Sequence, residues 1–172
     1  MNTPRQALMP AILLSAAVLA CAPAESPPPE AAAPGVDTAA VMAGVADLWS
    51  RWAVADTADD LDGILALLNE DGRLDLKGFP PLLGREAARA AMGPLYAQVD
   101  YLEATATPSF TIAISSALAH QAGTYMERYT LEGQKGEMTD HGRYATALAK
   151  GADGQWRWAY MMAMVDSTVT RK

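Results

Sequence analysis

The apolar residues of this 172-residue chain change their spacing near residue 100. In the first half they recur every three or four positions, as in Val41, Val45, Leu48 and Trp52, which is the spacing of one face of a helix. The second half contains stretches rich in Thr, Tyr, Ile, Val and Trp, separated by short polar turns. Helices followed by antiparallel strands predict an α+β fold in which a curved sheet wraps around about three helices. The predicted strands are residues 103–115, 119–131, 138–150 and 155–169.

The first half also carries signals for where its helices begin and end. Asp37 or Thr38 is a natural N-terminal cap for the first helix, and Asp59 or Asp60 is one for the second. The polar residues 56–60 separate the two helices. Gly93-Pro94 is expected to end or kink the third helix, because proline lacks the N–H that a helix interior needs. The predicted elements are helices at 38–52, 61–68 and 84–92, a short strand at 73–76 and a loop at 78–81.

The N-terminus carries an apolar segment, Ala7–Ala20, which follows a short polar start containing Arg5. It is shorter than the roughly 20 apolar residues that a membrane-spanning helix needs, and it has the layout of a secretory signal. Its end, Val18-Leu19-Ala20-Cys21, resembles the cleavage site of bacterial lipoproteins, in which the cysteine becomes the lipidated N-terminus. Ordinary secretion remains open, because Ala20-Cys21-Ala22 also fits a small-residue cleavage site.

This reading divides the chain into residues 1–20 as signal peptide, 21–35 as lipidated cysteine and Pro/Ala-rich linker, and 36–172 as one domain. The resemblance implies a protein exported to the bacterial cell envelope and held by a lipid anchor. The outer membrane, facing the periplasm, is the favoured location because Ala22 follows the cysteine, where an inner-membrane retention signal prefers Asp. A soluble secreted or periplasmic protein is the alternative.

Charge and motif content exclude several classes of partner. The chain has 13 basic and 20 acidic residues and no Lys/Arg cluster, which argues against nucleic acid as a partner. The single cysteine excludes an internal disulfide. Two histidines and scattered acids give no metal-ligand spacing, and no Gly-rich phosphate loop is present, so neither a metal nor another cofactor is expected.

Three ordered segments resemble the SnoaL-like, ketosteroid-isomerase-like superfamily, also called the nuclear transport factor two-like fold, and its branch of unknown function in particular. The first is Trp49–Ala53 together with Asp60–Leu67, and the second is Pro80–Glu86. The third joins Thr139–Tyr144 to Asp153–Trp158. The resemblance implies a cone-shaped sheet around the helices, a pocket inside the cone, and a homodimer. Because this fold hosts many activities, it does not define a function.

The resemblance also shows which positions would carry steroid-isomerase chemistry. A phenol, a carboxylate base and a protonated acid are needed there. The tyrosine position falls on Trp52 and the base position on Leu76, while the acid position falls near Ala145 or Thr146. None of these residues can do the expected chemistry, so the sequence predicts a cone without steroid-isomerase activity.

Other polar residues are weaker candidates for catalysis. Asp75 lies next to the base position, but strand neighbours point to opposite faces. Glu127 lies between Tyr125 and Tyr129 on one strand face, and Asp140 is followed by His141. The candidates for pocket lining are Trp52, Leu76, Tyr125, Tyr129, Tyr144, Ala159, Met161 and Ala163.

Three functions therefore remain open. The leading prediction is a membrane-tethered module that binds a small apolar or amphipathic ligand without isomerase chemistry. The second is an enzyme, such as an isomerase, dehydratase or hydrolase, that uses a carboxylate in the pocket. The third is a structural dimer whose cone is filled by its own side chains. An open cone with a buried acid and a tyrosine within hydrogen-bond reach would favour the enzyme.

Overall fold

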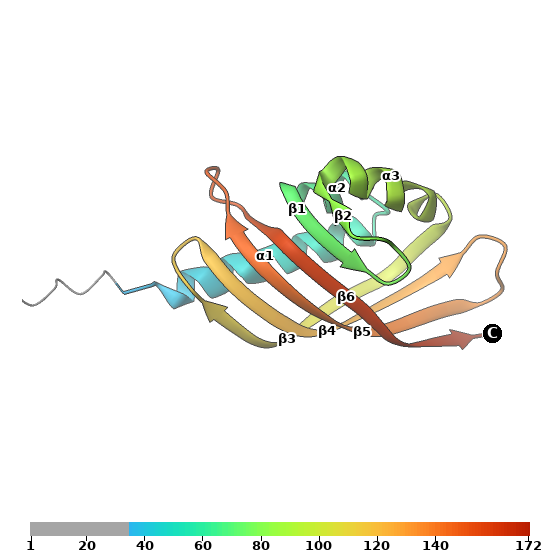
Figure 1. Cartoon of the computed structure of the whole chain (residues 1–172). Coiled ribbons are helices and arrows are strands. Elements are labelled where there is room, and N and C mark those ends of the chain that lie inside the picture. The colour runs from blue at the N-terminus through green and yellow to red at the C-terminus, as the bar shows by residue number, and fades with distance from the viewer. Residues whose placement is uncertain (1–34) are drawn as a thin grey trace, which may run out of the picture. The chain divides into compact units, whose positions relative to one another are not determined.

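The computed structural model describes residues 35–172, which form three helices and one six-stranded sheet (Figure 1). Cys21, the predicted signal peptide and the predicted linker up to residue 34 lie outside the described residues. No helix in the described part of the chain is long and apolar enough to cross a bilayer. The elements are α1 Thr38–Asp56, α2 Leu61–Ala66, β1 Leu68–Leu76, β2 Leu82–Leu83, α3 Gly84–Tyr96, β3 Val99–Ala113, β4 Leu118–Leu131, β5 Glu137–Lys150 and β6 Trp156–Arg171.

The predicted α+β fold is confirmed, with the helices on one face of a curved sheet (Figure 1). The strand order is β2-β1-β6-β5-β4-β3, and the pairs from β3 to β6 are antiparallel, as expected for a meander. β1 instead pairs in parallel with β6, because the chain returns to it from the far edge of the sheet. The sheet is therefore mixed, whereas the sequence predicted antiparallel pairing.

Helix capping agrees with the sequence at the first two helices. The Asp37 carboxylate accepts a hydrogen bond from the backbone N–H of Ala40 at 3.0 Å, and Asp60 accepts one from Gly63 at 2.9 Å. Both satisfy backbone donors that a helix leaves unpaired in its first turn. Gly63 also lets α2 lie against α1, because a Cβ there would lie 2.9 Å from that of Ala55.

The third helix does not end at Gly93-Pro94 but runs on to Tyr96. Pro94 lies in the final turn, where its missing N–H removes one helical hydrogen bond without affecting the turns before it. At this end of the helix the backbone N–H of Ala97 donates to the carbonyl of Gly93, and that of Gln98 donates to the carbonyl of Leu95. The extra turn matters for the site because it carries Tyr96.

A bulge in β6 changes which of its residues face the helices. Leu148 pairs with Trp158 and Ala147 pairs with Tyr160, so Ala159 is an extra residue on β6. An extra residue reverses the inward and outward alternation beyond it. Trp158 before the bulge and Met161 and Ala163 after it therefore face the same side.

The core lies between the inner face of the sheet and the apolar faces of the helices. Its centre includes Leu48, Leu65 and Leu148, each no more than 2 % exposed. Burial of such side chains contributes about 1.5–3 kcal/mol each and is the main stabilising contribution in a domain of this kind. The core does not fill the whole space between the helices and the sheet, and the remaining space is a cavity.

Candidate functional site

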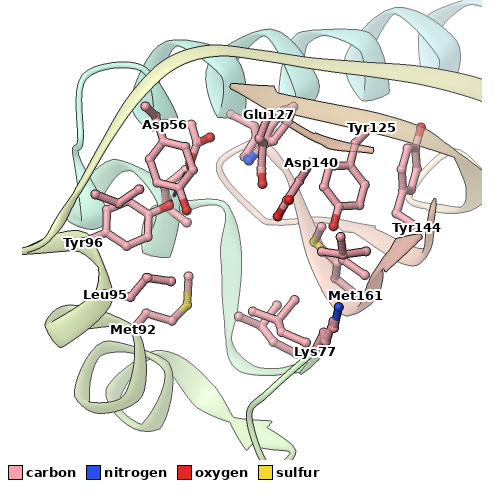
Figure 2. Close-up of a pocket in the computed structure, with 18 of the residues that line it drawn as sticks. Asp56, Lys77, Met92, Leu95, Tyr96, Tyr125, Glu127, Asp140, Tyr144 and Met161 are labelled. Carbon is pink, nitrogen blue, oxygen red and sulfur yellow. Dashed lines mark hydrogen bonds between the residues drawn. The ribbon is translucent and has the colours of Figure 1, made fainter. Parts of the chain in front are cut away.

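A cavity of about 260 Å³ opens between α1, α3 and the inner face of the sheet (Figure 2). Most of its lining is aromatic or aliphatic, which suits a small apolar molecule. Three carboxylates and one ammonium group interrupt this lining. They are Asp56, Glu127, Asp140 and Lys77.

Asp56 is the most deeply buried of these groups, at 1 % exposure. It is the last residue of α1 and extends the helix face that also carries Trp49 and Trp52. Its Oδ1 accepts a hydrogen bond from the hydroxyl of Tyr96 at 2.8 Å, whereas its Oδ2 is buried without a protein partner. Burial raises the pKa of Asp56 to about 6, with a further rise from Asp59 and an opposing effect of the Tyr96 hydrogen bond.

Tyrosine rings form one side of the cavity. The Tyr96 and Tyr101 ring centroids are 5.5 Å apart, and those of Tyr101 and Tyr129 are 5.8 Å apart. Burial, together with the nearby carboxylates, raises the pKa of Tyr96 and Tyr101 above the ordinary phenol value. Both phenols therefore stay protonated and can act as hydrogen-bond donors at neutral pH.

Glu127 and Asp140 are two acidic residues that lie opposite each other on neighbouring strands. They are directly opposite partners in the β4–β5 ladder, and both line the cavity. Burial, followed by the charges of Asp56 and Asp140, raises the pKa of Glu127 to about 8. Asp140 accepts a hydrogen bond from the Thr168 hydroxyl at 2.5 Å.

Asp56 and Glu127 together give the site one base and one acid. Since each carboxylate disfavours ionisation of the other, their protons leave in two separate steps. The pKa is about 6 for Asp56 and about 8 for Glu127, so at neutral pH the pair holds one proton, which Glu127 carries for most of the time. Such a separation of two neighbouring acids is the usual way in which a site assigns acid and base roles.

The structure brings most of the sequence-predicted residues to this cavity. Glu127 and Asp140 lie in its wall, and all but one of the predicted lining residues line it. Ala159 is absent from the lining, because it is the bulge residue of β6. The predicted residues that do line the cavity are Trp52, Leu76, Tyr125, Tyr129, Tyr144, Met161 and Ala163.

Asp75 and His141 lie elsewhere. Asp75 alternates with Leu74 and Leu76 along β1, so it points to the outer face of the sheet. There it accepts hydrogen bonds from Arg73 Nε at 2.9 Å and from the Tyr160 hydroxyl at 3.0 Å. His141 alternates in the same way with Asp140 and is exposed on the outer face. Neither residue joins the cavity carboxylates.

A buried hydrogen-bond network lies behind two of the aromatic residues that line the cavity, Trp49 and Tyr144. The side-chain oxygen of Gln121 accepts hydrogen bonds from the indole N–H of Trp49 and, at 3.0 Å, from the hydroxyl of Tyr144. Its amide nitrogen donates to the Thr111 hydroxyl at 2.7 Å. Because these polar atoms are satisfied within the protein, Trp49 and Tyr144 present mainly their rings to the cavity.

The sequence pattern did not indicate Asp56, Tyr96 or Lys77 as site residues. The sequence predicts a polar break at Asp56, whereas in the structure its spacing of four from Trp52 continues the buried stripe of α1. That spacing is the one signal that could have identified it, because an acid on an apolar face is unusual. Tyr96 lies beyond the predicted end of its helix, and Lys77 lies in a loop whose position depends on the fold.

No known protein-family profile matches the chain. No curated protein matches its sequence either. Many solved structures share its architecture. A ketosteroid isomerase-like protein from Erwinia carotovora atroseptica has a TM-score of 0.60 and 18% identity, over 77% of this chain and 95% of the other.

Two further structures show the range of proteins on this fold. A hexachlorocyclohexane dehydrochlorinase, LinA type 3, from Novosphingobium barchaimii has a TM-score of 0.66 and 14% identity, over 78% of this chain and 92% of the other. A protein of unknown function from Mycobacterium tuberculosis has a TM-score of 0.60 and 21% identity, over 73% and 76% of the two chains. The chain thus has the ketosteroid isomerase-like fold, which includes enzymes and proteins of unknown function.

Proposed function

We propose that the cavity is the active site of an enzyme that moves a proton on a small apolar molecule, as isomerases and lyases do. The observation that carries the proposal is a buried carboxylate, Asp56, with one oxygen held by Tyr96 and the other unpartnered in the cavity wall. An ionised carboxylate without a full set of hydrogen bonds is costly to bury. Such a group is typical of a site where a substrate completes the arrangement.

The roles of the residues follow from their protonation. The Asp56 carboxylate removes a proton from carbon, so the C–H bond breaks and an O–H bond forms on the carboxylate. In an isomerisation the electron pair moves to a carbonyl oxygen, and Asp56 then returns the proton to a different carbon. In an elimination the electron pair forms a double bond and expels a leaving group. Protonated Glu127 stabilises that oxygen or gives its proton to the leaving group. Tyr96 keeps Asp56 oriented throughout.

The structural neighbours support this class without identifying the substrate. The dehydrochlorinase named above removes hydrogen chloride from its substrate, as its name states. At 14% identity the likeness concerns the fold alone. The proposal therefore rests on the arrangement of Asp56, Tyr96 and Glu127 in this chain.

Binding without chemistry is the second candidate, as the sequence first suggested. The side chains of Met92, Leu95, Phe79 and Met161 favour it, because they give the cavity an apolar surface that needs no reaction. The cavity is open, so we do not propose a cone filled by its own side chains. The two remaining candidates differ in whether Asp56 removes a proton.

Hydrogen exchange in D₂O tests the proposal without knowledge of the full reaction. The full-length protein is incubated with a panel of small apolar ketones, β-hydroxyketones and haloalkanes, and deuterium uptake or elimination is followed by NMR. We expect catalysis with at least one compound class, with a bell-shaped pH dependence between about pH 6 and about pH 8. Asp56→Asn should reduce the rate by at least about 100-fold.

Asp62→Asn is the matched control, because Asp62 is exposed on α2 and pairs with Arg89 outside the cavity. Its rate should equal that of the unmodified protein. Catalysis that survives Asp56→Asn undiminished would refute the assignment of the base. Binding of panel compounds without any exchange or elimination would favour the binding module instead.

We also propose that the protein is exported and held at the bacterial envelope through a lipid on Cys21. The support is in the sequence: an apolar segment, Ala7–Ala20, ends at the chain's single cysteine. A homodimer is proposed as well, on the resemblance to the superfamily. Membrane fractionation of a Cys21→Ser variant tests the anchor, and sedimentation of the purified protein tests the dimer.

A further inference from the structure

The charged groups of the cavity are arranged unevenly. Among the described residues that line it, Asp56, Glu127 and Asp140 are acidic and Lys77 is the one cation. Figure 2 shows the three acids along one side of the cavity, while Lys77 lies on the opposite side with its nitrogen beside Met161. Leu76, Met92 and Met161 are among the apolar side chains that form the rest of the lining.

Lys77 is available to a ligand. The ion pairs found within residues 35–172 are all formed by arginines, and none includes Lys77. The raised pKa values of Asp56 and Glu127 come from burial and neighbouring carboxylates, with no contribution from Lys77. The ammonium group is therefore separate from the acids and does not serve to neutralise them.

The loop that carries Lys77 is constrained. Lys77 follows the last residue of β1, and Gly78 adopts φ +87°, a left-handed conformation that most other residues avoid. The backbone N–H of Phe79 donates to the carbonyl of Leu76 at 3.2 Å, and the Phe79 ring packs against the core. Pro80 and Pro81 restrict the chain that follows. The turn therefore holds Lys77 at the rim of the cavity.

We propose that Lys77 is an anion-recognition residue and that the cavity takes an amphipathic carboxylate, with the anion at Lys77 and the apolar body inside. The acid wall repels a carboxylate, so the ligand enters in one orientation only, with its neutral part toward Asp56. This deepens the proposed function, on which it rests, by naming a substrate class. A cavity of about 260 Å³ suits a molecule of about a dozen non-hydrogen atoms.

A matched pair of probes tests the proposal: 4-phenylbutanoate and its uncharged analogue 4-phenylbutanamide. Dissociation constants are measured by calorimetry on the full chain at pH 7. We expect the carboxylate to bind about three- to fivefold more tightly than the amide, the size of effect that a solvent-exposed ion pair gives. The preference should shrink between 0.05 and 0.5 M salt, because exposed charges are screened.

Substitutions separate Lys77 from general charge effects. Lys77→Gln should abolish the preference and leave amide binding unchanged, whereas Lys77→Arg should retain it. Lys135→Gln, in the exposed β4–β5 turn, is the matched control and should behave as the unmodified protein. Equal affinity for the two probes, a preference that persists in Lys77→Gln, or no binding of either probe up to about 10 mM would each overturn the proposal.

The two proposals fail differently. Asp56→Asn should lose exchange activity while keeping the Lys77-dependent preference, because it leaves the rim unchanged. If no exchange occurs but the preference depends on Lys77, the enzymatic proposal fails and the ligand class stands. If exchange requires Asp56 but the probes bind equally, the ligand class fails and the enzyme stands.

Discussion

Asp56 and Glu127 are acidic residues in the buried wall of the cavity. Apolar residues at these two positions would make the domain more stable. Asp56 continues a helix face formed by Val45, Leu48, Trp49 and Trp52, and it ends that face inside the cavity. The raised pKa values mean that the folded state favours the protonated acids more than the unfolded chain does. The pair therefore links the stability of the domain to pH.

The direction of that link follows from the pKa values. Stability due to the protonated acids is complete below about pH 4, and it is lost as pH rises through about 6 for Asp56 and about 8 for Glu127. Glu127→Gln removes the larger of the two pH-dependent contributions to the unfolding free energy, because the pKa of Glu127 is raised further than that of Asp56. We expect it to match the unmodified protein near pH 4 and to exceed its unfolding free energy by about 1–2 kcal/mol at pH 9, after allowance for solvent in the cavity.

Urea denaturation at pH 4, 7 and 9 measures this effect. Glu132→Gln, in the exposed turn after β4, removes the same charge outside the cavity and controls for net charge. Parallel pH profiles for Glu127→Gln and the unmodified protein would show that Glu127 does not carry the pH dependence.

At the scale of elements, the bulge in β6 decides which side chains reach the site. Regular alternation from Trp158 would turn Met161 and Ala163 outward, and the extra residue at Ala159 turns them inward. After deletion of Ala159, either the β5–β6 pairing shifts by one residue or Met161 and Ala163 no longer face the cavity. We expect a loss of about 3 kcal/mol in the unfolding free energy, because either outcome breaks buried packing.

Thermal and urea unfolding of the Ala159 deletion measure that loss. Ala159→Gly keeps the residue count and should cost no more than about 1 kcal/mol. If the Ala159 deletion variant is as stable as the unmodified protein, β6 can pair and pack without its bulge.

For the whole molecule, the sequence predicted the fold better than the site. The four long strands and three helices follow from local spacing, and the turn after Leu131 fixes the β4–β5 register that places Glu127 opposite Asp140. The bulge at Ala159, the final turn that carries Tyr96 and the position of Lys77 depend on contacts between distant segments. Such contacts leave no local period in the sequence. The positions of these site residues therefore could not be predicted from the sequence.

The proposed anchor is also a property of the whole chain. Cys21→Ser should move the protein from the membrane fraction to the soluble fraction of the envelope, because the lipid chains supply the membrane affinity. A Ser26→Ala variant, a few residues further along, is the matched control and should stay with the membrane. A Cys21→Ser variant that remains in the membrane fraction would exclude a lipid on this residue.

The aromatic lining of the cavity gives the protein an optical property. Of the four tryptophans in the chain, Trp49, Trp52 and Trp158 line the cavity, and the Trp49 ring lies 5.5 Å from that of Trp52 and 5.6 Å from that of Trp158. A molecule that enters displaces water from beside these indoles and changes their emission. The intrinsic fluorescence of the unlabelled protein is thus a direct reporter of occupancy, suited to screening compounds before any reaction is known.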